Sequence, residues 1–194
     1  MRPGPRRRQE GIVLMVALIM LVAMSLAGVA LMRSVETAVI VAGNFAFKEA
    51  GVQVADSGVQ EAARWIGVNS TGNTLYNDNP PAGYSSALPP VDPDYFDLNN
   101  WGSSVVMNGG TPDASGNVVR YVIHRMCTLA ATPWDDPDNE CGKQTSRATT
   151  EGGSKRRDAP QFEGPPILYY RVTTRVDGPR NTVTVIQTSL AVPI

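Results

Sequence analysis

An acidic tract between two cysteines has the residue types and spacing that come closest to a metal site in this sequence. The tract holds four carboxylates, those of Asp135, Asp136, Asp138 and Glu140. Calcium prefers carboxylate and carbonyl oxygens on flexible loops, but the glycine and the distal glutamate of an EF-hand loop are missing. We therefore expect a solvated loop tip, with calcium binding as the less favoured alternative. A second acidic group, which comprises Asp92, Asp94 and Asp97, leads to the same expectation.

The two cysteines that flank this tract, Cys127 and Cys141, would close a loop of about 15 residues. If this part of the chain lies outside the cytoplasm, oxidising conditions allow a disulfide there. In the entropic model such a bridge stabilises the fold by about 3 kcal/mol. A zinc site is less expected, because two cysteines and a single histidine make a poor ligand set. We expect a Cys127–Cys141 disulfide and no metal or other cofactor.

His124 is the single histidine and the first residue to test for catalysis. A strand predicted over Val118 to Met126 places it on the face opposite Tyr121 and Ile123, so we expect an ordinary exposed histidine. The sequence also lacks a glycine-rich phosphate loop and a nucleophile elbow. These observations predict that the protein is not an enzyme.

The elements that position these residues begin with an unbroken apolar run from Ile12 to Met32. About 21 helical residues span roughly the 30 Å of a bilayer core, whereas a signal peptide has a shorter apolar segment. Four arginines precede the run and only Arg33 lies close after it. The positive-inside rule therefore predicts a cytoplasmic N-terminus, with the rest of the chain outside the bacterial inner membrane.

The junction between Gly11 and Ile12 resembles the cleavage signal of type IV prepilins, with a short basic leader ending in glycine before an apolar helix. The resemblance implies that a membrane peptidase cuts after Gly11 and that the new N-terminus, Ile12, is methylated. Two residues depart from the pattern: Ile12 stands in place of Phe or Met, and Val16 in place of a glutamate. A carboxylate inside hydrocarbon is kept only for a partner, so Val16 favours a minor subunit over the bulk pilin.

A stripe of apolar residues continues the helix beyond the membrane, with members at spacings of three or four from Val35 to Ile66 and one gap near Glu49. This predicts one helix over residues 12 to about 66, onto which a globular region packs. Four glycines lie along it, and each weakens the helix by up to about 1 kcal/mol relative to alanine. They predict close helix contacts or a local break, most readily at Gly43-Asn44, and glycines merely tolerated in a packed helix are an equal alternative. The glycines are Gly28, Gly43, Gly51 and Gly58.

The same stretch resembles, more narrowly, the N-terminal region of PilX-type minor pilin assembly proteins. That family has an apolar segment ending near Gly-Val-x-x-Met-Arg, then Ala-Gly-Asn and an Ala-Phe-x-Ala helical stretch. The matching residues are Gly28, Val29, Met32, Arg33, Ala42, Gly43, Asn44, Ala46, Phe47, Ala50, Ala55 and Gly58. Asp56 with Ser57 stands where the family has Glu-Ala, which keeps the charge. The match covers about a quarter of the chain, and the closing segment ILYYRVTTRVDGPRNTVTVIQTSL also resembles the end of these proteins.

The closing segment also predicts a β-hairpin from its residues alone. Polar and apolar residues alternate from Leu168 to Val176, Asp177-Gly178-Pro179 supplies a turn, and Thr182 to Val192 is a second β-rich run. A short strand at Val105 to Met107 would join the strand predicted at Val118. The fold class that follows is α+β and pilin-like: a long N-terminal helix packed on a small antiparallel sheet with long loops.

Residues 67 to 117 and 142 to 166 are rich in Asn, Gly, Pro and Ser and are predicted to be mostly loop. The chain carries 17 basic and 18 acidic residues, and removal of residues 1–11 leaves 13 and 17. A mature chain of net charge about −4 is not a nucleic-acid binder by its overall field. The basic run Lys155-Arg156-Arg157 is expected to be a solvated loop, or to meet an acidic partner subunit.

Four regions follow: a leader at 1–11, a transmembrane or filament-core helix at 12–33, its amphipathic continuation at 34–66, and a globular periplasmic region at 67–194. The PilX-type resemblance implies a non-catalytic minor pilin that primes assembly of the type IV pilus and lies near the filament tip. Its implied partners are the other minor pilins, the major pilin, the prepilin peptidase, the inner-membrane assembly platform, membrane lipid and a tip adhesin. Two alternatives remain: a minor pseudopilin of a type II secretion system, and a single-pass membrane-anchored adhesive or ligand-binding domain.

Overall fold

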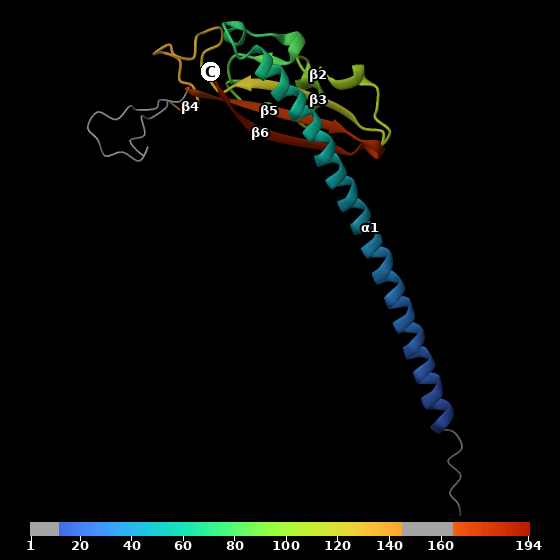
Figure 1. The fold of residues 1–194 in the computed structure, drawn as a ribbon. Helices are drawn as coiled ribbons and strands as arrows, with labels where there is room; N and C mark the ends of the chain where they lie inside the picture. The colour runs from blue at the N-terminus through green and yellow to red at the C-terminus, as the bar shows by residue number, and fades with distance from the viewer. Residues whose placement is uncertain (1–11, 145–164) are drawn as a thin grey trace, which may run out of the picture. The chain divides into compact units, whose positions relative to one another are not determined.

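The computed structural model describes residues 12–144 and 165–194, which form one long helix and a six-stranded sheet (Figure 1). Helix α1 runs over Ile12–Asn69 without interruption. The break considered at Gly43-Asn44 is therefore absent, because apolar helix formers on both sides outweigh the cost of one glycine. The chain divides into two compact units, Met1–Phe47 and Lys48–Ile194, and α1 contributes to both.

The sheet of the second unit is built around the hairpin of β5 (Ile167–Asp177) and β6 (Val183–Pro193). Strand β3 (Val118–Arg125) pairs antiparallel with the other edge of β5. The hairpin and the strand at 118 were both predicted from their alternating side chains, and the structure confirms them. The turn between β5 and β6 contains the short 3₁₀ helix η5 (Pro179–Asn181).

Three two-residue strands complete the sheet. β2 (Val105–Val106) pairs antiparallel with β3, and β4 (Lys143–Gln144) pairs antiparallel with β5. β1 (Tyr84–Ser85) pairs parallel with β3, with Tyr84 opposite Ile123. The sheet is therefore mixed and not purely antiparallel as expected, although the α+β class is confirmed. The other short elements are the 3₁₀ helices η1 (Thr74–Tyr76), η2 (Pro80–Ala82), η3 (Leu98–Trp101) and η4 (Met107–Gly110).

The main core lies between the sheet and the last turns of α1. Ala62 and Ile66 of the helix pack with Tyr121, Ile123 and other inward side chains of β3 and β5. The helix approaches closely at two glycines: a β-carbon at Gly51 would stand 2.6 Å from Thr184 Oγ1, and one at Gly58 would stand 2.7 Å from Thr174 Cγ2. These two glycines mark close contacts, whereas Gly28 and Gly43 have no neighbour within 4 Å.

The helical stripe is buried over a shorter length than its sequence predicts. Its buried members begin at Gly51 and end at Ile66, whereas Val35 and Phe45 remain exposed. The stripe's period is the same in both parts, but in the described residues only the part from Gly51 onward lies against the sheet. Packing therefore occupies the last third of the helix and leaves the apolar residues before it exposed.

The opposite face of the sheet is covered by the segment between β1 and β2. Tyr95 and Trp101 of this segment pack with Val122 of β3 and contact Val185 of β6. Their rings meet edge to face with centroids 5.5 Å apart. The segment predicted to be loop thus forms a second, smaller hydrophobic layer.

Candidate functional site

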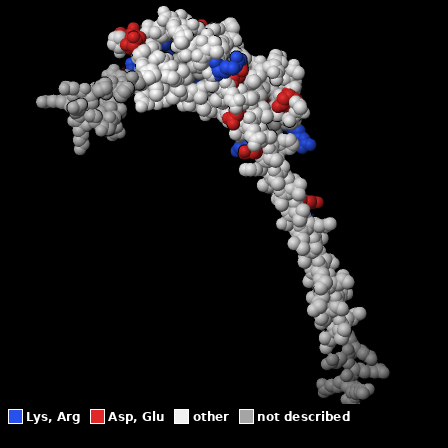
Figure 2. All heavy atoms as spheres, viewed as in Figure 1, with Lys and Arg blue, Asp and Glu red and all other residues white. Residues whose placement is uncertain are grey.

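The N-terminal part of α1 presents an apolar surface of a kind that soluble proteins do not expose. Every side chain from Ile12 to Met32 is exposed, and the helix contains a window long and apolar enough to cross a membrane. Figure 2 shows this surface free of Lys, Arg, Asp and Glu on the visible side. A contiguous apolar surface of this size requires lipid or other subunits around it, so this helix could serve as a membrane anchor.

The predicted processing site lies at the boundary of the described residues. Ile12 is the first residue that the structure describes, and it is helical; Gly11 lies outside the described residues. Val16 is exposed one turn further along, at the place where a pilin glutamate would stand. The first charged side chains after the apolar run are those of Arg33 and Glu36.

A disulfide joins Cys127 to Cys141 and closes the loop that holds the acidic tract. Inside this loop the buried side chain of Asn139 accepts a hydrogen bond from Leu129 N (3.0 Å) and donates one to the Pro133 carbonyl (3.0 Å). Arg125, which ends β3, donates from Nη2 to the Thr132 carbonyl (2.6 Å). The loop is thus held by internal polar contacts as well as by the covalent bridge.

The acidic side chains described in this loop do not come together to form a metal-binding site. In residues 12–144 and 165–194, no group of three or more His, Cys, Asp or Glu side chains could hold a metal ion. Asp136 Oδ1 instead accepts a hydrogen bond from Asp138 N at 2.9 Å. The candidates Asp135 and Glu140 carry exposed side chains that contribute no metal-binding geometry.

The second acidic group is used to fold its own segment. Asp94 Oδ1 accepts a hydrogen bond from Phe96 N, and Asp97 Oδ1 accepts one from Asn99 N. Asp92 lies 2.7 Å from Arg171 Nη2. Two of the three carboxylates therefore stabilise turns, and the third pairs with a strand residue.

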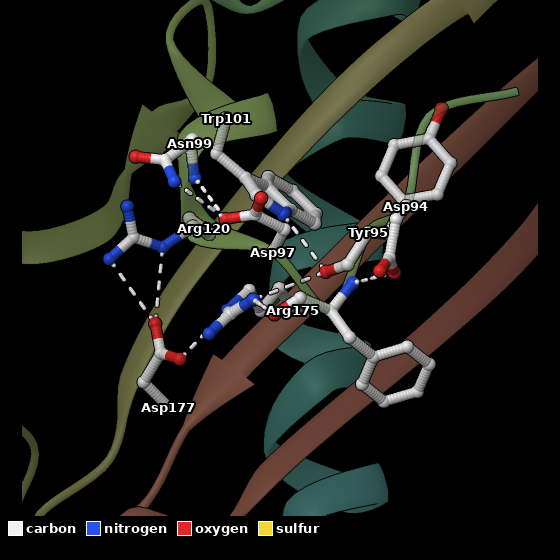
Figure 3. A network of polar contacts seen from close by, with 9 residues as sticks. Asp94, Tyr95, Asp97, Asn99, Trp101, Arg120, Arg175 and Asp177 are labelled. Carbon is white, nitrogen blue, oxygen red and sulfur yellow. Dashed lines mark hydrogen bonds and ion pairs between the residues drawn. The ribbon is translucent and has the colours of Figure 1, made fainter.

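Figure 3 shows how this segment is attached to the outer face of the sheet. Arg175 of β5 is almost fully buried and donates from Nη1 to the Phe96 carbonyl (2.6 Å) and from Nε to Asp177 Oδ1 (2.8 Å). Asp177 Oδ2 also forms an ion pair with Arg120 Nη2 of β3 at 3.2 Å. Trp101 Nε1 donates to the Tyr95 carbonyl at 3.0 Å. This network of ion pairs and hydrogen bonds positions the aromatic layer.

His124 lies on the predicted strand face but is not an exposed histidine. Burial and, to a smaller extent, the positive charge of Arg171, its neighbour on β5, lower its pKa to about 4. The nearby carboxylates of Asp92 and Asp78 oppose this shift. The expectation of exposure was wrong because the segment between β1 and β2 covers this face, which the strand's own periodicity cannot show. His124 is thus neutral at physiological pH, and the structure gives it no catalytic partner among the described residues.

Three polar residues that sequence reasoning overlooked, Arg125, Asn139 and Arg175, organise the globular region. Arg125 follows Val119, Tyr121 and Ile123 at intervals of two, so the strand period itself predicts that it points inward. It is completely buried, and its Nε donates to the Ser86 carbonyl at 2.7 Å. The inward position of Arg125 could therefore have been predicted from the sequence. The partners of Asn139 and Arg175 could not, because tertiary contacts determine them.

The fold and this surface define a class: a single apolar N-terminal helix joined to an α+β unit is the architecture of pilin-like proteins. Residues 10–60 match the family model described as PilX N-terminal. The match covers about a quarter of the chain and supports a PilX-type pilin assembly protein. Comparisons with curated proteins and with solved structures gave no match.

Proposed function

We propose that this protein is a non-catalytic minor pilin that helps to prime assembly of the type IV pilus and lies near the filament tip. The observation that carries the proposal is the combination of the PilX N-terminal match over residues 10–60 with an exposed apolar helix on a folded sheet unit. One helix of this kind serves two environments, lipid before assembly and neighbouring subunits after it. Both surroundings are apolar, so transfer between them need not carry a large hydrophobic cost.

Processing fits the same proposal. A membrane peptidase cuts between Gly11 and Ile12, and Ile12 becomes the methylated N-terminus of the mature chain. The basic leader stays in the cytoplasm, and the disulfide-containing unit lies in the periplasm, where Cys127 and Cys141 can be oxidised.

Val16 supports a minor role. With no carboxylate between Ile12 and Met32, the helix cannot form an ion pair with the amino terminus of a neighbouring subunit. A subunit of this kind joins a small complex of minor pilins on the assembly platform and is followed by the major pilin. A tip adhesin is a further proposed neighbour.

A deletion strain of the source bacterium tests this proposal and separates it from its alternatives. We expect few or no surface pili, normal protein secretion, and recovery of pili when the full-length chain is restored. Normal pili with lost secretion would identify a pseudopilin of a type II secretion system instead. Normal pili and normal secretion would favour a membrane-anchored adhesive or ligand-binding domain.

Matched leader variants sharpen the test. Gly11→Lys blocks the proposed cut and should fail to restore pili, because an uncut helix keeps its basic leader at the membrane. Gly4→Lys makes the same substitution seven positions earlier in the leader and should restore them. Equal recovery by both variants would contradict a requirement for processing.

A further inference from the structure

One fully buried arginine faces a cavity without a counter-ion. Arg125 has no exposed surface, and no carboxylate among the described residues forms an ion pair with it. Its Nε and Nη2 donate to the carbonyls of Ser86 and Thr132, but Nη1 has no hydrogen-bond acceptor in residues 12–144 and 165–194. Buried charges in proteins are normally paired, so this guanidinium lacks both a partner charge and an acceptor.

Among the described residues, no neighbouring acidic or phenolic group forms an ion pair with Arg125. Hydrogen bonds from Ser86 and, to a smaller extent, the charge of Arg125 lower the pKa of Asp78, and Ser86 is hydrogen-bonded to both residues. Burial raises the pKa of Tyr170 to about 12 and raises that of Tyr84 as well. Both phenols are therefore neutral at physiological pH, although the charge of Arg125 partly opposes these shifts.

Arg125 forms part of the wall of a cavity of about 240 Å³. The apolar and aromatic part of the wall comprises Leu75, Tyr76, Trp134, Leu168, Tyr170 and Ile194, and the remainder comprises Ser70, Gly72 and Asn73. The acceptors of Nε and Nη2 belong to residues outside this wall, so Nη1 is the guanidinium nitrogen that remains available to a ligand, although it is buried in this structure. Tyr76 and Trp134 are only half-buried, so their rings can turn to admit a ligand to Arg125.

We propose that this cavity binds a small monocarboxylate with an apolar or aromatic body, whose carboxylate pairs with Arg125. Carboxylates accept paired hydrogen bonds from a guanidinium, and the aromatic wall suits an apolar body. The volume lies below the usual range of about 300 to 1,000 Å³ for ligand pockets, so the ligand is small. Arg125 is the single charged side chain of the wall, which favours one negative charge over the two of a phosphate.

The site does not depend on the pilus role, since all its residues lie in the unit Lys48–Ile194. The test uses the full-length chain in detergent, with calorimetric titration of phenylacetate, its neutral analogue phenylacetamide, and inorganic phosphate at constant ionic strength. We expect saturable binding of phenylacetate at one site and none of phenylacetamide or phosphate. Absence of phenylacetate binding, equal binding of the amide, or binding of phosphate alone would overturn the proposal.

Variants locate the binding. Arg125→Met should weaken phenylacetate binding by about tenfold or more, because a charge-assisted pair is lost. Arg125 also donates hydrogen bonds to the carbonyls of Ser86, Thr132 and Leu129, so this variant can unfold. Trp134→Ala removes part of the wall without touching those hydrogen bonds and should also weaken binding. Arg171→Met, which changes a mostly buried arginine on the opposite sheet face, should leave the affinity unchanged. Unchanged affinity in both cavity variants would contradict the assignment.

Discussion

Gly58 of α1 lies so close to Thr174 of β5 that a β-carbon at position 58 would stand 2.7 Å from Thr174 Cγ2. Val119 of β3 closes the same space from the other side, with its Cγ1 at 3.1 Å. Both neighbours are β-branched side chains on central strands, so neither can move away easily. This contact fixes how closely the helix approaches the sheet.

We therefore expect Gly58→Ala to lower the free energy of unfolding by about 1 to 2 kcal/mol, since overpacking outweighs the gain in helix propensity. Urea unfolding of the full-length chain in detergent, followed by near-ultraviolet circular dichroism, measures this change. Gly43→Ala is the matched control, because nothing lies within 4 Å of a β-carbon there. A Gly58→Ala protein as stable as the control would show that the helix can shift at no cost.

The disulfide gives a second prediction. Replacing Cys127 and Cys141 together with alanine should lower the free energy of unfolding by about 3 kcal/mol, because the unfolded chain gains the freedom of a 15-residue loop. Dithiothreitol should lower the stability of the unmodified chain by a similar amount and leave the double variant unchanged. An unchanged stability after reduction would mean that the hydrogen bonds of Arg125 and Asn139 alone hold the loop.

His124 predicts a pH dependence. Its pKa of about 4 in the folded state lies below the ordinary 6.5, so between these values the unfolded chain binds a proton that the folded chain does not. The free energy of unfolding should therefore increase by about 2 kcal/mol between pH 4 and pH 6.5 for this partly exposed group, and the same amount is lost when the pH is lowered through this range.

Two variants test whether His124 causes this dependence of stability on pH. His124→Gln should flatten the curve between pH 4 and pH 6.5. Asp92→Asn should keep it, because Asp92 opposes the lowering of the His124 pKa. A slope that survives in His124→Gln would have to come from other groups.

The outer-face network predicts a large effect from one arginine. Arg175→Met should lower the free energy of unfolding by about 2 to 3 kcal/mol, since it leaves the Phe96 carbonyl without its donor and Asp177 with only Arg120. Trp101 fluorescence should shift at the same time, because the segment that carries it loses its attachment. Arg64→Met, on an exposed helix position with one ion pair to Glu61, should change stability by less than about 1 kcal/mol.

The helix and the hairpin were predictable because their signals are local. The apolar run from Ile12 and the alternation from Leu168 to Val176 each depend on periods within one element, and the structure has both. Gly51 and Gly58 were among the four glycines predicted to mark close contacts or a local break, with tolerated glycines as an equal alternative, and the sequence could not separate them from Gly43. That distinction depends on which strand lies opposite, and Thr184 and Thr174 are more than 100 residues away in the chain.

The remaining features depend on tertiary packing that no local period encodes. The parallel pairing of Tyr84 with Ile123 joins a two-residue strand to a distant one, too short to leave a pattern. The burial of His124 results from the segment around Tyr95, which composition alone describes as loop. Arg125 is the exception: its inward position follows from the strand period, but only the structure shows that it has no ion-pair partner among the described residues.

The central claim, that Ile12 begins the mature, polymerising helix, is tested most directly by intact-mass analysis of the protein purified from its own bacterium. The proposal predicts a chain that starts at Ile12 with the mass of one added methyl group, while Gly11→Lys retains the leader. A chain that starts at Met1 or Arg2 in the unmodified protein would contradict it.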